Sequence, residues 1–111
     1  MIAEKLSGKS WEKNIKEKIF TPLGMTSSNF SIQDLAKAAD ASLGYTLYKD
    51  SIIRKTDYYD INAMGPAGSI NSSVNEMSNW VITWINAGKF NGKEVLPAAY
   101  AKEAMSSQMV M

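Results

Sequence analysis

The clearest pattern of apolar and polar positions lies between residues 73 and 88. Ser73 and Glu76 have the spacing of a capping box, and the apolar residues that follow recur at helical intervals: Val74, Met77, Val81, Trp84 and Ile85. The pattern predicts a helix that begins after Ser73 and runs toward Gly88. Trp80 and Trp84 are one helical turn apart, and we expect them to pack in the core rather than stack on a ligand.

Shorter helices are predicted elsewhere by the same two signals. Ser10 can cap a helix whose apolar stripe is Trp11, Ile15 and Ile19, and this helix should end before Pro22 because proline disfavours a helical residue ahead of it. The other predicted helical segments are residues 1–6, read as the last turns of a helix, residues 32–39 after a Ser31–Asp34 capping box, and residues 98–105 with Pro97 at their start.

The pattern changes to period two from Leu43 to Tyr48, which is typical of a strand. Lys49 to Ser51 can turn the chain, and Ile52 to Tyr58 can return as the partner strand. Residues 60–71 contain two glycines and a proline among small polar residues, which favours an ordered loop, and Asn91-Gly92 is a turn signal. The predicted fold is therefore mainly α with a small β-hairpin.

The amino-acid composition limits the classes of function that this chain can have. The 111 residues suffice for one domain, are 45% apolar and 21% charged, and carry a net charge of +1, so no bulk field attracts nucleic acid. The sequence has neither cysteine nor histidine, which excludes thiolate metal sites, cysteine nucleophiles and histidine bases. No apolar run approaches the roughly 20 residues that span a bilayer. We expect no metal, cofactor, nucleic-acid or membrane partner.

Three stretches carry a resemblance. Residues 4–11 lead into a Pro-Leu-Gly-Met turn at 22–25, residues 65–73 form a small-residue loop before a capped helix, and residues 91–97 connect to the next helix. In this order they resemble the family of class C β-lactamases, D-alanyl-D-alanine carboxypeptidases and related esterases. Two positions depart from the family: Ser69 stands where a second glycine is usual, and Glu76 where aspartate is usual.

The resemblance implies a fold and a place in the active-site cleft. The chain resembles the helical portion of the β-lactamase and transpeptidase-like fold, without most of its α/β sheet, so residues 1–111 are interpreted as a single partial domain. Ala67, Gly68 and Ser69 match a loop that lines the family's cleft, where their small size leaves room for an acyl group. These three are the predicted substrate-binding residues.

The family's catalytic motifs are a Ser-x-x-Lys helix, a Tyr-x-Asn segment and a Lys- or His-x-Gly strand. Ser10 and Lys13 satisfy the first by letters alone, but Ser10 is better explained as an N-cap, which needs no partner elsewhere. Ser69-Ile70-Asn71 spells Ser-x-Asn within the loop, and Lys55-Thr56-Asp57 lacks the glycine of the third motif. No Tyr-x-Asn occurs, so no catalytic residue is predicted.

Other polar and aromatic groups receive a structural interpretation. Tyr58 and Tyr59 flank the cleft or pack on the hairpin, and the sequence leaves both possibilities open. Asp57 and Asp60 could act in general acid–base catalysis or bind a cation, yet spaced carboxylates in a polar loop usually face solvent. The lysines at 13, 16 and 18 and the glutamates at 12 and 17 form a solvated helix face.

Two functions remain in competition. The first is a fragment of a serine hydrolase, inactive alone, whose parent hydrolyses a β-lactam, a D-alanyl peptide or an ester through an acyl-serine. Exposed apolar surface would then cause self-association. The alternative is a free-standing helical module that binds a protein or peptide through its tryptophan-bearing helix. The fragment hypothesis predicts that Ile2, Leu6 and Val110 lack apolar partners.

Overall fold

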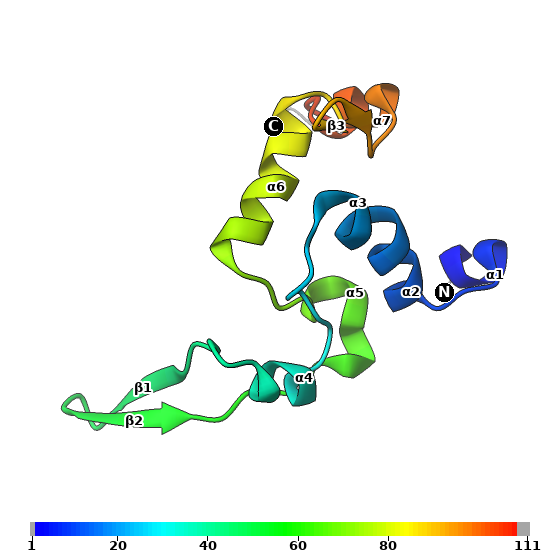
Figure 1. Cartoon of the computed structure of the whole chain (residues 1–111). Coiled ribbons are helices and arrows are strands. Elements are labelled where there is room, and N and C mark those ends of the chain that lie inside the picture. Colours follow the sequence, from blue (N-terminus) through cyan, green and yellow to red (C-terminus); the bar gives the residue numbers. More distant parts are fainter. Residues whose placement is uncertain (1, 109–111) are drawn as a thin grey trace. The chain divides into compact units, whose positions relative to one another are not determined.

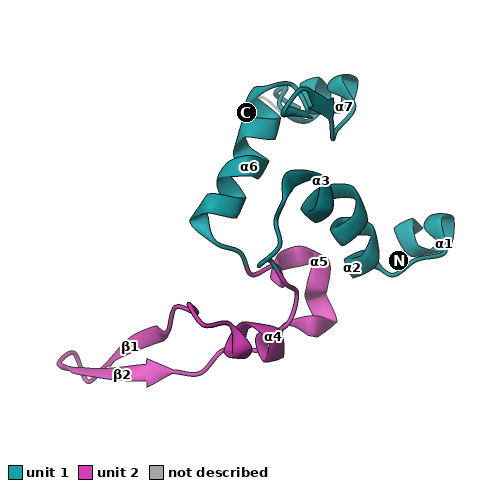
Figure 2. Ribbon diagram, viewed as in Figure 1, with its two compact units in different colours: residues 1–28, 72–111 teal, residues 29–71 magenta. Residues whose placement is uncertain are grey.

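The computed structural model describes residues 2–108, which fall into two compact units (Figures 1 and 2). Unit 1 holds residues up to 28 and from 72 onward, and unit 2 holds residues 29–71. The elements of unit 1 are α1 (Ile2–Ser7), α2 (Trp11–Ile15), the π-helical turn η1 (Lys16–Phe20), α3 (Thr21–Leu23), α6 (Val74–Ile85), β3 (Lys89–Phe90), β4 (Lys93–Glu94) and α7 (Ala98–Ala104). Those of unit 2 are α4 (Ile32–Lys37), β1 (Gly44–Tyr48), β2 (Ile52–Thr56), the 3₁₀ turn η2 (Asn62–Met64) and α5 (Gly65–Gly68). This confirms a mainly helical fold with a small hairpin.

The prediction that the first long helix ends before Pro22 is wrong. The chain stays helical from Trp11 through η1 and α3, and it ends at Gly24, whose φ of 65° is left-handed. In η1 a backbone N–H bonds the carbonyl five residues earlier, as in the bond from the Thr21 N–H to the Lys16 carbonyl. Pro22 then occupies the first turn of α3, where its missing N–H leaves no bond unmade.

The core of unit 1 is small and lies where α3 packs against α6. Its fully buried apolar side chains are Phe20, Leu23, Met25 and Ala101. Leu23 also accepts, through its carbonyl, a hydrogen bond of 2.9 Å from the side-chain amide of Asn79 on α6. Thr83, completely buried on the same helix, donates its hydroxyl to the Asn79 carbonyl at 2.8 Å. The polar groups inside this unit are therefore paired, as buried groups must be.

Helix α6 confirms the strongest sequence pattern, although it ends earlier than predicted. Ser73 Oγ accepts the Glu76 N–H at 3.3 Å and so caps the start. The helix ends at Ile85, and the Gly88 N–H then bonds the Thr83 carbonyl at 2.8 Å with φ at 92°. Trp80 and Trp84 are half-buried and pack edge to face, with ring centroids 5.5 Å apart.

After α6, the backbone at Gly88 lies close to the backbone at Leu96. The Gly88 carbonyl accepts hydrogen bonds from the N–H groups of Val95 and Leu96 at 2.9 and 3.0 Å. A Cβ at Gly88 would stand 2.2 Å from the Leu96 carbonyl oxygen, so only glycine fits. The predicted turn at Asn91-Gly92 is confirmed, with φ of 48° and 77°, and it joins β3 to β4. These two short strands were not predicted.

The predicted hairpin of unit 2 is confirmed as the antiparallel pair of β1 and β2, in which Tyr48 faces Ile52. Its turn is left-handed at Lys49 and Asp50, with φ of 50° and 56°. All residues of both strands are exposed. Within the described residues, the period-two alternation therefore does not produce one buried face and one solvent-exposed face. Strand β2 ends at Thr56, two residues earlier than predicted.

The rest of unit 2 is held by local bonds. Ser31 caps α4 by accepting the Asp34 N–H at 3.1 Å, and α4 ends at Lys37 rather than Ala39. Residues 29 and 71 form an antiparallel bridge, with N–H to carbonyl distances of 3.0 and 2.9 Å in the two directions. The bridge closes unit 2 at its two ends.

The expectation of a loop without regular structure over residues 60–71 is wrong for its middle part. Residues 62–68 form the consecutive turns η2 and α5. Asp60 Oδ1 accepts the Asn62 N–H at 2.9 Å in the turn that leads into η2, whose N-cap residue is Ile61. Pro66 lies in the first turn of α5, where proline is well suited to a helix. Short helical turns therefore satisfy the backbone of this glycine-containing stretch.

Candidate functional site

The site that the sequence predicts belongs to unit 2 and borders a depression of about 100 Å³. Its lining residues are Phe30, Ile32, Leu35, Tyr58, Tyr59, Ile61, Asn62, Gly68, Ser69 and Asn71. Gly68 and Ser69 therefore lie beside this depression, whereas Ala67, also on α5, is exposed and outside its lining. Of the aromatic pair, Tyr58 is half-buried and Tyr59 is exposed, and both line the depression.

Hydrogen bonds hold the rim of this depression in place. The Ser69 N–H donates to the Gly65 carbonyl at 2.9 Å, which completes the last turn of α5. The Asn71 side-chain amide donates to Asn29 Oδ1 at 2.9 Å, and the Tyr58 hydroxyl donates to the Ser42 carbonyl at 2.5 Å. The lining is therefore positioned by backbone and amide contacts and not by a large core.

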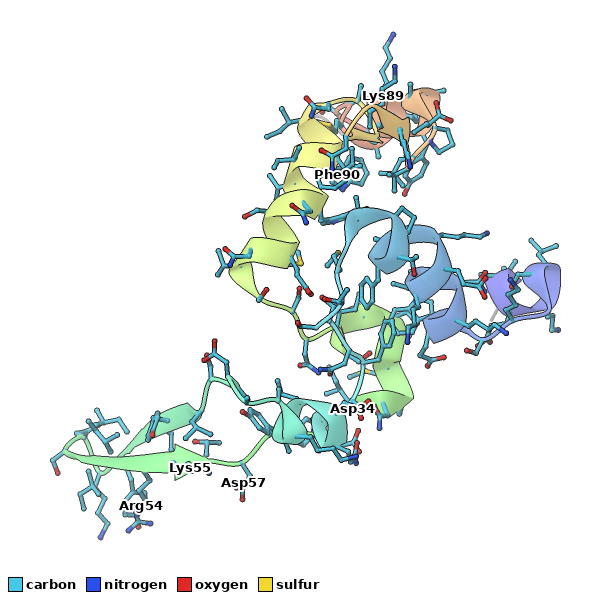
Figure 3. The ribbon with its side chains drawn as sticks, in the orientation of Figure 1. Asp34, Arg54, Lys55, Asp57, Lys89 and Phe90 are labelled. Carbon is cyan, nitrogen blue, oxygen red and sulfur yellow. The ribbon has the colours of Figure 1, made fainter. Side chains whose placement is uncertain are left out.

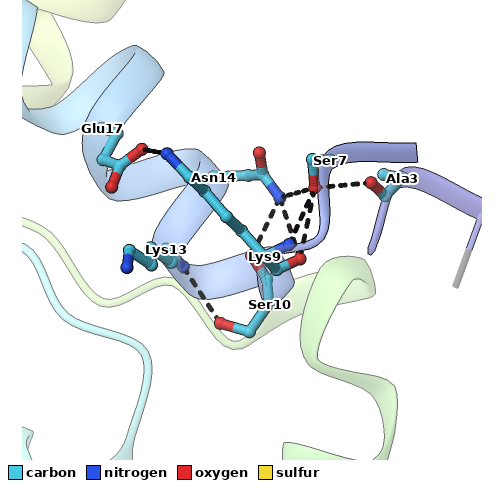
Figure 4. Close-up of polar contacts among 7 residues, drawn as sticks. All are labelled: Ala3, Ser7, Lys9, Ser10, Lys13, Asn14 and Glu17. Atoms are coloured by element: carbon cyan, nitrogen blue, oxygen red, sulfur yellow. Dashed lines mark hydrogen bonds and ion pairs between the residues drawn. The ribbon is translucent and has the colours of Figure 1, made fainter. Parts of the chain in front are cut away.

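The Ser-x-x-Lys match at Ser10 and Lys13 is a helix cap in the structure. Ser10 Oγ accepts the backbone N–H of Lys13 at 3.3 Å, and Figure 4 shows the Lys13 ammonium directed away from it. A nucleophilic serine needs a base within hydrogen-bond reach. The predicted capping role of Ser10 is confirmed.

The other motif matches lie on different elements. Lys55 and Thr56 end strand β2, and Asp57 follows directly, all exposed (Figure 3). Ser69-Ile70-Asn71 begins at the C-cap of α5, as the loop interpretation predicts. These sets therefore supply no paired base and nucleophile.

Asp57 and Asp60 are both exposed, and Asp60 accepts the hydrogen bond from the Asn62 N–H described above. Within residues 2–108, no group of three histidine, cysteine, aspartate or glutamate side chains is placed to hold a metal ion. No helix in this part of the chain is long and apolar enough to cross a membrane.

Glu76 is a buried side chain whose role sequence reasoning interpreted too narrowly. It was assigned to a capping box, but its carboxylate reaches across unit 1 and accepts the Ser27 N–H at 2.7 Å and the Ser28 hydroxyl at 2.6 Å. Burial by itself raises the pKa of Glu76, yet the hydrogen bonds from Ser28 and Ser27 outweigh it and lower the pKa below its ordinary value. Glu76 is therefore an ionised structural anchor, and its spacing from Ser73 gives no sign of this long-range contact.

Comparisons with known proteins agree with these elements. A family model described as Beta-lactamase matches residues 1–110. Beta-lactamase-like protein 2 of Dictyostelium discoideum is 28% identical over 102 residues, which cover 92% of this chain and 18% of that protein. Beta-lactamase-like protein 1 of the same organism is 30% identical over 78 residues, which cover 70% of this chain and 12% of that protein.

The structural comparison extends the likeness to the backbone. The octameric penicillin-binding protein homologue from Pyrococcus abyssi matches with a TM-score of 0.78 and 31% identity, over 96% of this chain and 22% of that one. This chain thus spans less than a quarter of the length of each of these proteins. The comparisons do not favour the alternative of a free-standing binding module. From the family match over residues 1–110, the chain belongs to the beta-lactamase family.

Proposed function

We propose that residues 1–111 form one partial domain of a β-lactamase-related serine hydrolase, supply part of its helical scaffold, and carry no acylating chemistry of their own. Two observations support this proposal. The family model matches residues 1–110, and Ser10 caps α2 by accepting the backbone N–H of Lys13. The parent enzyme would hydrolyse a β-lactam, a D-alanyl peptide or an ester, with serine, lysine and tyrosine supplied by other segments.

The second part of the proposal is that Ala67, Gly68 and Ser69 form part of the wall of the active-site cleft. Gly68 and Ser69 line the depression of unit 2, and Gly68 offers no side chain that would fill it. A Cβ at Gly68 would stand 3.5 Å from Ile61 Cδ1, so a larger group there would lie against the lining. Small residues therefore keep this wall open for an acyl group.

The third part is that the chain self-associates. Its buried apolar core is limited to four side chains, whereas many large apolar side chains are exposed among residues 2–108. Ile2 and Leu6 are 80% and 84% exposed, and Val110 lies outside the described residues. A broad open surface also follows α6, with Val74, Met77, Val81 and Ile82 along it. Apolar surface on this scale favours association in water.

A chimera tests the scaffold and cleft roles directly. The matching segment of the Pyrococcus abyssi homologue would be replaced by this chain, and hydrolysis of nitrocefin and of a p-nitrophenyl ester would be compared with the unmodified homologue. We expect the chimera to keep the activity of that reference. Gly68→Leu in the chimera should reduce the rate, whereas Ala36→Leu on the exposed side of α4 should not. An inactive but folded chimera would contradict the scaffold role.

The isolated chain tests the absence of its own chemistry. We expect no saturable hydrolysis of either substrate and no fluorophosphonate or penicillin label. A label at Ser10 that disappears in Ser10→Gly, a substitution that keeps most of the capping, would overturn the proposal. Sedimentation velocity tests self-association, which a monodisperse monomer would contradict.

A further inference from the structure

The hairpin of β1 and β2 has two outer strand edges. Figure 2 shows both strands extending from the rest of unit 2, and within residues 2–108 the sheet that they form has no third strand. The outward N–H and C=O groups of an edge strand can pair with another strand, and a two-stranded sheet gains stability when strands are added. Each edge is therefore a surface that can accept a further strand.

The two edges differ in charge. Strand β2 contains Arg54 and Lys55, whereas β1 contains no charged residue and no proline. Natural proteins use charged side chains, lysine above all, to keep edge strands from pairing with other chains. If two β2 strands paired antiparallel about their central residue, Arg54 would stand directly opposite its own copy, and the like charges would repel. The edge of β2 is thus protected against a second copy, and the edge of β1 is not.

One face of the hairpin carries exposed apolar side chains. Successive side chains of a strand lie on opposite faces, and residues paired across two strands share a face. Tyr45 and Leu47 therefore lie on the same face as Ile53, which pairs with Leu47. These three side chains are 63%, 59% and 72% exposed. Arg54 lies on the other face, where its guanidinium is 4.0 Å from the centroid of the Tyr48 ring.

Strand β1 is complementary to a second copy of itself. An antiparallel pairing centred on Thr46 aligns all five residues of the strand and places Tyr45 of each copy opposite Leu47 of the other. Such aromatic–aliphatic pairs stabilise a sheet, and here they join the apolar faces of the two hairpins. The joined face ends on each side at Lys55, which pairs with Tyr45 within the hairpin. A shift of one residue would place the two apolar faces on opposite sides of the sheet.

We propose that two copies of this chain pair through β1, antiparallel and centred on Thr46, to form a four-stranded sheet with one continuous apolar face. The outer strands are then the two β2 strands, whose Arg54 and Lys55 oppose further addition, so the pairing closes at a dimer. A five-residue strand is a small interface, so this dimer is weak and depends on concentration. The inference rests on the self-association in the proposed function and names its surface, and it does not depend on the hydrolase role.

Cysteine cross-linking of the full chain tests the register, because the chain has no cysteine of its own. In Thr46→Cys the two thiols stand directly opposite each other, at a Cα separation that a disulfide can bridge. Thr56→Cys is the matched control, because it is the same substitution at an exposed position of β2, and its two thiols would be at least about 14 Å apart, three strand spacings. With oxidised glutathione as the oxidant, non-reducing electrophoresis should show at least about tenfold more covalent dimer for Thr46→Cys.

A charge substitution tests the same pairing without a covalent bond. In Thr46→Glu the new carboxylate lies opposite Arg54 within the hairpin, which is favourable, but opposite its own copy in the dimer, which is not. Sedimentation velocity at low salt should show association about fivefold weaker than that of the unmodified chain. Added sodium chloride should restore part of the loss, because it screens the repulsion. Thr56→Glu is the control and should associate as the unmodified chain does.

Equal cross-linking of the two cysteine variants would overturn the β1 pairing, as would association that Thr46→Glu leaves unchanged. If Thr46→Cys disturbs the amide signals of the hairpin, a mixture of Tyr45→Cys and Leu47→Cys takes its place. The mixture should give a covalent heterodimer, whereas each variant alone should not, because identical positions are then diagonal and about 7–8 Å apart.

The β1 pairing and the proposed function fail separately. An oligomer whose Thr46→Cys variant does not cross-link removes only the β1 pairing, whereas a monomer without cross-linking also removes the proposed self-association. An inactive chimera together with intact cross-linking of this chain removes only the scaffold role.

Discussion

Units 1 and 2 are stabilised in different ways. Unit 1 contains the buried apolar side chains and the buried polar anchors Glu76 and Thr83, so its helices are joined by contacts between residues far apart in sequence. In unit 2 the buried residues are Gly65 and Ser69, and the structure there depends on strand pairing, caps and the Asn29–Asn71 bridge.

This difference shows where the chain tolerates change. Removing a buried group leaves a cavity or an unpaired partner, so substitutions in unit 1 should lower the free energy of unfolding strongly. Substitutions on exposed elements of unit 2 should have small effects and act locally. The unit with the smaller buried core also contains the candidate site, so substitutions at that site are expected to leave the core of unit 1 intact.

The largest contrast is expected between two leucines. Leu23 is 1% exposed in the core of unit 1, and Leu23→Ala should lower the free energy of unfolding by about 2–5 kcal/mol. Leu47 is exposed on β1, and Leu47→Ala should cost about 0.5 kcal/mol or less. Urea unfolding followed by tryptophan fluorescence measures the first, since all three tryptophans lie in unit 1. Amide exchange measures the second. Equal losses would remove the distinction between the units.

A pair of glycines gives the next contrast. Gly88→Ala in unit 1 places a Cβ against the Leu96 carbonyl at a position where φ is 92°, and it should cost about 2–3 kcal/mol. Gly68→Ala in unit 2 makes only an ordinary contact with Ile61 and should change stability by about 0.5 kcal/mol or less. Thermal unfolding by circular dichroism compares the two variants. If Gly88→Ala leaves the stability unchanged, the closeness of the Gly88 and Leu96 backbones does not restrict this position to glycine.

The buried carboxylate of Glu76 gives a smaller, pH-dependent effect. Because the folded-state pKa of Glu76 is lowered from its unfolded-state value, its contribution to stability is full above the unfolded-state pKa and is lost as pH falls through the folded-state pKa. Glu76→Gln should cost about 1–2 kcal/mol at neutral pH and flatten this acid dependence. Denaturant unfolding between neutral and acidic pH measures both effects.

Glu17 is the matched control for this experiment. The hydrogen bond from Lys9 lowers the pKa of Glu17 as well, but the pair is exposed, with Lys9 before α2 and Glu17 in η1. Glu17→Gln should therefore leave neutral-pH stability nearly unchanged, since solvent screens exposed pairs. A larger loss for Glu17→Gln than for Glu76→Gln would show that burial is not what gives Glu76 its effect.

The smallest effect is expected on the hairpin. The Arg54 guanidinium lies 4.0 Å from the centroid of the Tyr48 ring, a cation–π contact at an exposed site. Arg54→Ala should destabilise the hairpin by about 0.5 kcal/mol, seen as faster amide exchange in β1 and β2. Lys55→Ala, at the neighbouring position of β2, is the control and should exchange as the unmodified chain does. No difference between the two variants would assign hairpin stability to pairing and turn alone.

The local features of this protein were determined by sequence. Ser10, Ser31 and Ser73 cap the helices that follow them, because a cap needs only the N–H groups two or three residues ahead. The turns at Lys49-Asp50 and Asn91-Gly92 were likewise found from nearby residues. The resemblance predicts Ala67, Gly68 and Ser69 as substrate-binding residues. Gly68 and Ser69 line a depression and Ala67 does not, and substrate binding by these residues stays a prediction.

Contacts between distant residues were decided only by the tertiary structure. The bonds from Ser27 and Ser28 to Glu76 and the burial of Ser69 each depend on groups that local spacing does not bring together. The physical reason is that periodicity and capping describe interactions within one turn of the chain. Burial and hydrogen-bond pairing depend instead on which distant segment comes to lie against a residue.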